Sequence, residues 1–345
     1  MPSIVDIFND DAFSATSLTA AINVVPNDYG RLRELNLFPE EPIPTTTVAV
    51  EYANGTLNLL PTRERGAPSS LGMPEKRQVR SFEAFHVPHD DFVRADDVQN
   101  ILARVGSAGV LESVQTLVNR KQITMRRKHA ITLEHMRMGA LRGEILDSDG
   151  SSLLNLFTTF GVTQQSVDFV LGTATTDVKA KARSVVSYME DNLEGEVMTG
   201  VHVLASPEWY EKFIGHAKVE EIYKYYDGQN NPLRQDVRRG FPFHGLTIEE
   251  YRGSAQYLQE DGTYATRRFV PAGEAIAFPL GTMDVFRTYF APADFMDTVN
   301  TLGEQIYVRQ AVDPEFQRWV KIHSQSNPLP LVKRPKLLVK LTSSN

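Results

Sequence analysis

Two histidines and two aspartates stand close together in the run His86-Val87-Pro88-His89-Asp90-Asp91. Imidazole nitrogens and carboxylate oxygens are common ligands of zinc and other transition metals. The proline between the two histidines prevents a helical pair of ligands, and no third ligand cluster lies at a diagnostic spacing. We therefore expect no metal site here. The pattern favours a polar turn that leaves a strand, with Asp90 or Asp91 capping the next element.

Other candidate sites lack the spacing that their chemistry needs. Asp147-Ser148-Asp149-Gly150 resembles the centre of a calcium loop, but the alignment puts Ile145 and Leu156 in two ligand positions. The sequence has no phosphate-binding glycine loop, dinucleotide fingerprint or nucleophile elbow. We expect no catalytic residue, no cofactor and no enzymatic activity. A hydrolase of unknown type is kept as a distant alternative, because catalytic sites assemble in space rather than in sequence.

A band of basic residues lies in the segment that we predict to be the longest helix; it consists of Arg120, Lys121, Arg126, Arg127 and Lys128. In structural terms such a band is a solvated or ion-paired helix face. In functional terms it could contact nucleic acid or a neighbouring subunit, and contacts with phosphates would be non-specific and sensitive to salt. We interpret His129 and His135, on the same segment, as surface or packing residues.

The composition is that of a folded, water-soluble chain. Of the 345 residues, 41% are hydrophobic and 23% are charged, which is enough to build a sizeable core. The absence of cysteine excludes disulfides and thiolate zinc sites. The net charge of -7 gives no overall basic footprint for nucleic acid. The acidic N-terminus and the lack of a membrane-length apolar run favour folding in the cytosol.

The first third of the chain alternates between extended and looped segments. Residues 1 to about 45 read as an arm, with a short helix from near Asp10 or Asp11 and a proline-broken strap from Leu35 to Pro44. Period-two alternation then predicts a strand from Thr45, with a turn at Asn54-Gly55. Alternation resumes at Val79. The two strands enclose a charged loop of about fourteen residues, a length that usually signals function or disorder.

The segment from residue 108 to residue 143 is predicted to be one helix about 50 Å long. Its apolar residues follow helical spacing: Val114, Leu117, Val118, Met125, Leu133, Met136 and Ala140. Short strands and helices alternate after it, and strands dominate from Phe243 onward. The sequence therefore predicts an α+β fold with one helix longer than its domain needs and two extended excursions.

Three groups of residues in the second half resemble the phage lambda major capsid protein E family. The first runs from Pro242 to an E-Y-R-G end at Glu250-Tyr251-Arg252-Gly253. The second combines Ala291-Pro292-Ala293-Asp294 with Asn300-Thr301-Leu302-Gly303, and resembles the A-P-A-D and N-T-x-G elements. The third is Ser326-Asn327-Pro328-Leu329-Pro330 with Arg334-Pro335 after it. Each motif alone is weak, whereas the three in order are specific. The first half resembles the family more loosely.

The resemblance implies the capsid fold named for phage Hong Kong 97. It assigns residues 1–45 to an N-terminal arm and 46–90 to a strand and an extension loop. Residues 91–150 become the peripheral domain with its spine helix, 151–300 the axial domain, and 301–345 the strands that return to the peripheral domain. No motif for covalent cross-linking is found, and no long charged helical leader precedes the arm, so scaffolding is expected from a separate protein.

The function implied is that of a major capsid protein. Copies would form pentamers and hexamers of an icosahedral head that encloses double-stranded DNA, with assembly in the host cytoplasm and final residence in the virion. The implied partners are the chain itself, a scaffolding protein and a portal, with a decoration protein as a further candidate; no membrane is involved. An encapsulin-like cellular shell, which would load enzyme cargo, is the nearest alternative.

Two groups of residues are expected to serve assembly. The basic band should lie near the inner face of the shell or at a subunit contact. The extension loop should project as a two-stranded ribbon whose apolar residues need another subunit, because an isolated hairpin is marginal in water. Its charged residues should form intersubunit ion pairs. The loop set is Leu57, Leu59, Arg63, Glu64, Arg65, Glu75, Lys76, Arg77, Val79 and Phe82.

Overall fold

The fold was analysed in a computed structural model, which describes residues 13–24, 30–53, 77–98, 110–221, 237–259 and 262–345. Helices and mixed sheets alternate, so the fold class is α+β as expected. The chain divides into two compact units. Unit 1 comprises Met1–Val48, Ser81–Glu134 and Thr288–Pro330; unit 2 comprises Ala49–Arg80, His135–Arg287 and Leu331–Asn345. Each unit is therefore built from three stretches that are distant in sequence.

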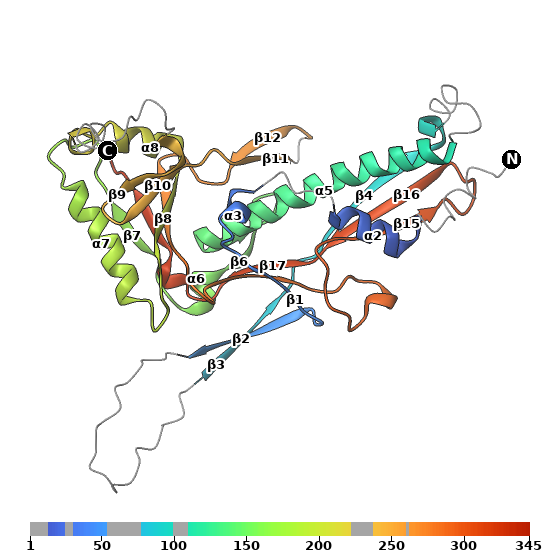
Figure 1. The fold of residues 1–345 in the computed structure, drawn as a ribbon, viewed down its shortest axis with the longest axis horizontal. Helices are drawn as coiled ribbons and strands as arrows, with labels where there is room; N and C mark the ends of the chain where they lie inside the picture. The colour runs from blue at the N-terminus through green and yellow to red at the C-terminus, as the bar shows by residue number, and fades with distance from the viewer. Residues whose placement is uncertain (1–12, 25–29, 54–76, 99–109, 222–236, 260–261) are drawn as a thin grey trace, which may run out of the picture. The chain divides into compact units, whose positions relative to one another are not determined.

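Unit 1 is organised around an antiparallel sheet of order β15-β16-β4. Helix α2 lies along β15, and the N-terminal part of helix α5 covers the same sheet (Figure 1). The bounds are α2 (Ala15–Val24), α3 (Arg31–Glu34), β4 (Val87–Arg94), α5 (Val110–Arg142), β15 (Tyr307–Val312) and β16 (Trp319–Ser326). One apolar cluster joins α2, β4, α5, β15 and β16 through Leu18, Ile22, Val93, Val118, Met125, Val308 and Ile322.

Helix α5 confirms the predicted long helix, which was expected from residue 108 to residue 143. The helix ends because Gly143 adopts a φ of 82°, a left-handed conformation that glycine reaches at little cost. A Cβ at this position would also lie 1.9 Å from the Phe157 ring. Glycine is therefore required at the end of the helix for two separate reasons.

The proline-rich strap is extended, as expected, and it also takes part in a sheet. β1 (Glu40–Pro42) runs parallel to β14 (Phe286–Phe290), in a three-stranded sheet completed by β17 (Pro328–Val332). The Ile43 N–H continues the contact by donating to the Phe290 carbonyl at 2.9 Å. β1 is thus held by backbone hydrogen bonds although its own side chains are exposed, while Leu37 and Phe38 earlier in the strap are buried.

The turn expected at His89, Asp90 and Asp91 is wrong, because these residues lie inside strand β4. The strand pairs with β16 from Val87↔Ser326 to Arg94↔Trp319. Side chains on β4 alternate between more and less exposed positions. The charged residues masked this alternation in the sequence, since the strand has few apolar residues to reveal it.

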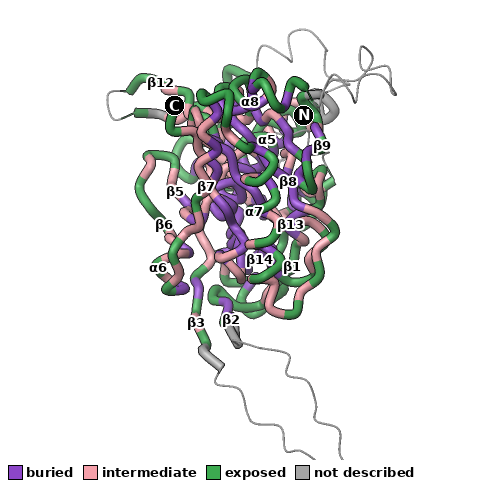
Figure 2. Tube along the Cα trace, turned by 90° about the vertical axis from the view of Figure 1, so that its left-hand side faces the viewer, coloured by how far each residue is buried: buried purple, intermediate pink, exposed green. Residues whose placement is uncertain are grey.

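Unit 2 contains a six-stranded sheet of order β7-β18-β13-β8-β10-β9. Its strands are β7 (Gln165–Asp168), β8 (Gly200–Ala205), β9 (Phe241–Phe243), β10 (Leu246–Glu250), β13 (Glu274–Leu280) and β18 (Val339–Thr342). Buried residues follow β8 and β13, the two central strands of this sheet (Figure 2). Strand β18 lies between β7 and β13, where residues from the far end of the chain complete the sheet.

A serine caps the start of one helix of unit 2. In α8 (Pro207–Ile214), the Ser206 hydroxyl accepts from the Trp209 N–H and proline occupies the first turn. The Trp209 and Phe213 rings stack 5.2 Å apart, and Phe213 meets Phe243 edge-on at 5.1 Å. Further helices of unit 2 are α6 (Leu156–Phe160) and α7 (Val178–Asp191), with short 3-10 turns at η4 (Val237–Arg239) and η6 (Pro335–Leu337). A third 3-10 turn, η5 (Met296–Thr298), belongs to unit 1.

Three two-stranded ribbons complete the described fold: β2 (Thr47–Ala53) with β3 (Arg77–Glu83), β5 (Glu144–Leu146) with β6 (Ser152–Asn155), and β11 (Ser254–Leu258) with β12 (Tyr264–Arg268). The pairing of β2 with β3 confirms the two strands predicted around the charged loop. The predicted turn at Asn54-Gly55 lies outside the described residues. Among the helices that the structure describes, none is long and apolar enough to cross a membrane.

Candidate assembly surfaces

The five residues of the basic band do not form one face of α5. Arg120 and Arg127 are exposed. The Lys121 ammonium pairs with the Asp91 carboxylate at 2.9 Å, and Lys128 donates to His89 Nε2 at 3.1 Å. Arg126 is buried. The band that is continuous in sequence is therefore divided among solvent, strand β4 and the interior of unit 1.

Arg126 is 5% exposed and has few partners for a buried cation. Its Nη2 donates to Gln305 Oε1 at 2.6 Å, and its Nη1 reaches Asn23 Oδ1 at 3.5 Å. Its Nε is buried and has no hydrogen-bond partner among the described residues. Burial and the nearby Arg33 lower the pKa of Arg126 from its ordinary value. A guanidinium nevertheless stays charged in proteins, so its burial needs a compensating group.

His129 lies one helical turn after Arg126 and is also buried. Its Nε2 meets the Ser324 hydroxyl at 2.9 Å, and that hydroxyl donates to the His89 carbonyl at 3.1 Å. Since the single hydroxyl proton of Ser324 goes to the carbonyl, the contact with His129 requires a proton on Nε2. Burial, followed by the effects of His89 and Arg126, lowers the pKa of His129 to about 3. The ring is therefore neutral at physiological pH, and the interpretation as a packing residue holds.

The four polar residues between 86 and 91 each contact a different group. His86 Nδ1 lies 3.0 Å from Asn327 Oδ1, and His89 contacts Lys128. The Asp90 carboxylate pairs with Lys321 and His323, both at 2.5 Å. In the part of the chain that the structure describes, no three histidine or acidic side chains are grouped to hold a metal ion. The segment acts as an ion-paired strand.

Both aspartates of this strand are held in the charged form by their partners. Partial burial would raise the pKa of Asp90, but hydrogen bonds from Lys321 and His323 outweigh it and lower the pKa. Partial burial of Asp91 is likewise outweighed by hydrogen bonds from Lys121 and from its neighbouring backbone N–H, so its pKa is also lowered. These carboxylates stabilise the folded unit at neutral pH.

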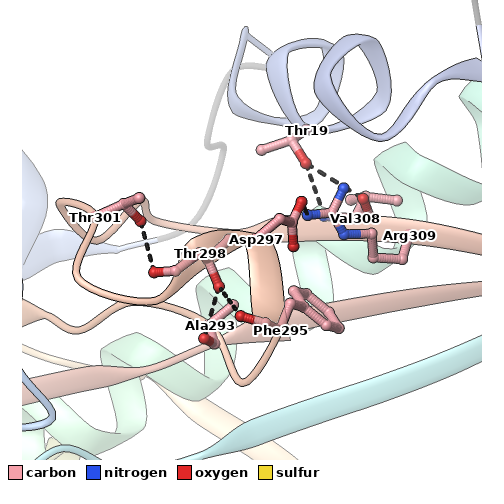
Figure 3. A network of polar contacts seen from close by, with 8 residues as sticks. All are labelled: Thr19, Ala293, Phe295, Asp297, Thr298, Thr301, Val308 and Arg309. Atoms are coloured by element: carbon pink, nitrogen blue, oxygen red, sulfur yellow. Dashed lines mark hydrogen bonds and ion pairs between the residues drawn. The ribbon is translucent and has the colours of Figure 1, made fainter.

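A polar network fixes the loop of residues 291–306, here called the 291–306 loop (Figure 3). The Thr298 hydroxyl donates to the carbonyls of Ala293 and Phe295 at 2.8 and 3.0 Å, and Thr301 donates to the Thr298 carbonyl at 2.8 Å. Asp297 pairs with Arg309, whose guanidinium lies 4.9 Å from the centre of the Phe295 ring. The loop is thus tied both to itself and to strand β15.

Residues of the motifs that resemble the capsid family hold this loop against the rest of unit 1. Asn327 Nδ2 donates to the Pro292 carbonyl at 2.6 Å, and the Ala291 N–H donates to the Asn327 carbonyl at 3.0 Å. A Cβ at Gly303 would lie 2.1 Å from the Phe290 carbonyl oxygen. The A-P-A-D, N-T-x-G and S-N-P-L-P elements therefore form one connected structural unit, which explains why they occur together.

The 291–306 loop presents three large apolar side chains to solvent. Met296 is 95% exposed, Val299 59% and Leu302 61%. Isolated exposed apolar residues are common, whereas three on one fixed loop make that loop a candidate surface for association. Sequence reasoning missed this set. Its signal was the spacing of three residues between apolar side chains in a segment otherwise rich in Asp, Asn and Thr.

The predicted extension-loop residues divide into three groups. Leu57, Leu59, Arg63, Glu64, Arg65, Glu75 and Lys76 lie outside the described residues. Arg77 begins β3, where Val79 is 62% exposed. Phe82 differs from the expectation, because it is 4% exposed within the single chain and needs no second subunit to cover it. Within unit 2, the Arg80 guanidinium lies 5.5 Å from the centre of the Phe160 ring.

A long helix on an antiparallel sheet, a second unit built on a mixed sheet and a paired-strand excursion define the Hong Kong 97 class of capsid fold. The structure is similar to that of the putative capsid protein of a prophage of E. coli CFT073, with a TM-score of 0.57 and 11% sequence identity. The similarity covers 96% of this chain and 99% of that one.

Residues 14–343 match the family described as phage major capsid protein E, and the chain belongs to this family. It is 33% identical over 342 residues to the major capsid protein of Pseudomonas phage KPP10, covering 95% of this chain and 96% of the relative. It is 26% identical to the major capsid protein of Salmonella phage Felix O1, covering 95% of each. Its role is therefore structural: it is a phage major capsid protein that builds a shell from copies of itself.

Proposed function

We propose that copies of this chain form both pentamers and hexamers, which close an icosahedral head around the double-stranded DNA of a tailed phage. The observation that carries the proposal is the fixed 291–306 loop with its three exposed apolar side chains. Such residues gain free energy when a second copy covers them. Heterologous contacts between identical chains close rings, and one chain serves both ring sizes. Family membership supports a phage head over the encapsulin-like shell and the hydrolase.

We assign residues 1–45 to the arm, 46–90 to the strand and extension loop, 91–150 and 301–330 to the peripheral domain, and 151–300 to the axial domain. Residues 331–345, expected to return to the peripheral domain, join the axial domain instead, because β18 lies in its sheet. The pairing of β2 with β3, on either side of residues 54–76, supports an extension loop. The exposed Arg120 and Arg127 are the basic residues of α5 best suited to face DNA or a neighbour. A contact with DNA would involve phosphates and weaken with salt.

The remaining partners are those that a phage head requires. A separate scaffolding protein sets the size of the shell, a portal occupies one vertex, and a decoration protein is a further candidate. Assembly takes place in the host cytoplasm before the protein becomes part of the virion. Catalysis has no place in this scheme, which is supported by the engagement of His86, His89, Asp90 and Asp91 with other side chains.

Expression together with the scaffolding partner, and then electron microscopy, tests the proposal. Closed shells with fivefold and sixfold rings are the expected result. A folded protein that stays monomeric in the presence of scaffold would contradict it. Shells that carry a cargo enzyme and never take up DNA would favour the encapsulin-like alternative.

The charged extension-loop residues give a second test. Arg63→Glu combined with Arg65→Glu should lower the yield of shells without unfolding the subunit, because the two substitutions reverse charges proposed to form intersubunit pairs. Each such pair contributes about 0 to 1 kcal/mol at an exposed site, and the effect is repeated at every subunit. Sedimentation measures the yield, and circular dichroism checks folding. Normal assembly of the double variant would remove this role from the loop.

A further inference from the structure

Arg126, on helix α5, does not have all of its hydrogen bonds satisfied by the described residues of unit 1. Its side chain is 5% exposed, and its Nε has no hydrogen-bond partner among the described residues. Within that part of the chain, no carboxylate forms an ion pair with it, and its hydrogen bonds go to the side-chain oxygens of Gln305 and Asn23. The Glu40 carboxylate attracts the guanidinium from a distance, but a buried cation without a direct ion pair is costly.

Two amides separate Arg126 from two glutamates. Gln305 accepts from Arg126 through Oε1 and donates through Nε2 to Glu40. Asn23 accepts from Arg126 through Oδ1, and its Nδ2 donates to Glu304 Oε2 at 3.1 Å. One amide side chain therefore lies between the guanidinium and each carboxylate. The amides occupy some of the donors of Arg126 but supply no negative charge.

A cavity of about 520 Å³ opens beside this arrangement. Its walls include Arg126 and Arg33 together with Asn23, Gln305, Glu40 and Glu304. The volume is large enough for an inserted side chain with its flanking backbone. All of these residues belong to unit 1, so the cavity lies within a single compact unit.

We propose that this cavity is an intersubunit acceptor site, in which an aspartate or glutamate of a second copy pairs with Arg126. The pair completes the buried guanidinium only when the shell forms. The inference deepens the proposed function and rests on it, because the ligand is supplied by another capsid subunit.

The chemistry of the walls selects the ligand. A carboxylate matches the planar fork of a guanidinium and carries a single charge. Glu40 and Glu304 at the same cavity repel a phosphate, which carries more charge, and they also disfavour the DNA backbone. The second copy is a ready source, since each chain has 43 acidic residues against 36 lysines and arginines.

Three variants test the site: Arg126→Gln removes the charge, Arg126→Lys keeps the charge without the fork, and Arg94→Gln changes an exposed arginine of the same unit, on strand β4. Each is expressed with the scaffolding partner, and the yield of shells is measured by sedimentation. The melting temperature of each unassembled subunit is measured in parallel. We expect Arg126→Gln to lower shell yield about tenfold or more, because a buried pair loses one partner. Its melting temperature should equal or exceed that of the natural chain.

Arg126→Lys should give an intermediate yield, and Arg94→Gln should behave as the natural chain. Normal shell yield for Arg126→Gln would overturn the inference, as would an equal loss of stability in the unassembled subunit, which is what a purely internal role predicts. If the natural chain itself forms no shells, the proposed function fails. If the natural chain forms shells and Arg126→Gln forms them with the same yield, the proposed function stands and the Arg126 site is wrong.

A map of the assembled natural shell gives a direct check. An oxygen of a neighbour's Asp or Glu within 4 Å of the Arg126 guanidinium supports the proposal, at the distance usual for an ion pair. A phosphate at that position, water alone, or the Glu40 of the same chain overturns it. Replacing the neighbour's acid by its amide should reproduce the assembly defect of Arg126→Gln.

Discussion

Arg126 and His129 are three residues apart on α5, both are buried, and each would be charged in water at mildly acidic pH. The two side chains differ in their charge inside the protein. His129 loses its proton, with its pKa lowered to about 3, and becomes an uncharged donor to Ser324. Arg126 cannot lose its proton and remains a buried cation with two amide partners.

The difference shows which buried groups a single subunit can accommodate alone. A titratable base becomes neutral at a cost in stability only at low pH. A buried permanent cation needs a counter-charge. Without one, its burial destabilises the fold at every pH. Residues of the second kind indicate a partner, whereas residues of the first kind indicate only packing.

Placing a permanent charge at the histidine position should have the largest effect. His129→Lys is expected to lower the free energy of unfolding by about 3 to 5 kcal/mol, because no carboxylate among the described residues is positioned to receive the ammonium. Denaturant titration of the unassembled subunit measures it. His129→Gln is the matched control, since it keeps a polar group of similar size without a charge. Similar midpoints for the two variants would mean that charge at this position does not matter.

The neutral state of His129 also predicts a dependence on pH. Its pKa in the folded state lies below the unfolded value of 6.5, so only the unfolded chain takes up a proton as the pH falls below 6.5. Stability is therefore complete above that pH and declines from 6.5 towards 3. At pH 4 the loss due to this residue is about 3 kcal/mol.

The comparison of the natural chain with His129→Gln isolates this loss from that of the carboxylates. Denaturation curves at pH 7 and pH 4 should show a greater fall for the natural chain. An identical fall in both proteins would assign the acid sensitivity to other groups, such as the paired Asp90 and Asp91.

Removing a charge from strand β4 should have the smallest effect. Asp90→Asn breaks contacts with Lys321 and His323 but leaves groups that water can solvate, so we expect a loss of about 0.5 to 1 kcal/mol at pH 7. The effect should shrink at high salt. Asp96→Asn, at an exposed position of the same segment, serves as control. If Asp90→Asn lowered the free energy of unfolding as much as His129→Lys, solvent exposure would not determine the energetic cost of these substitutions.

Regular elements with strong periodicity could be predicted from the sequence. The bounds of α5 and the cap of α8 are set by apolar spacing, Gly143 and Ser206, because local chemistry determines them. The paired strands β2 and β3 were also found. The sequence did not predict strand β4, because the residues that alternate between its two faces include His89, Asp90 and Asp91. Their polarity suggests a cluster of ligands rather than a strand.

The buried position of Arg126 could have been anticipated in part. Val118, Gln122, Met125 and His129 follow the spacing of a helix face, and Arg126 lies beside that line, yet a basic run suggests a solvated surface. The partners Gln305 and Asn23 are 179 and 103 residues away, so no local pattern identifies them. The cavity depends on how three distant stretches fold together.

The central place of β18 has a consequence for the order of events during synthesis. Residues 339–342 fill the gap between β7 and β13, so the sheet of unit 2 stays open until the ribosome has released them. Unit 1 likewise waits for residues 307–326. A nascent chain that lacks these residues thus has neither sheet complete. Association between folded subunits therefore has to follow the synthesis of both segments.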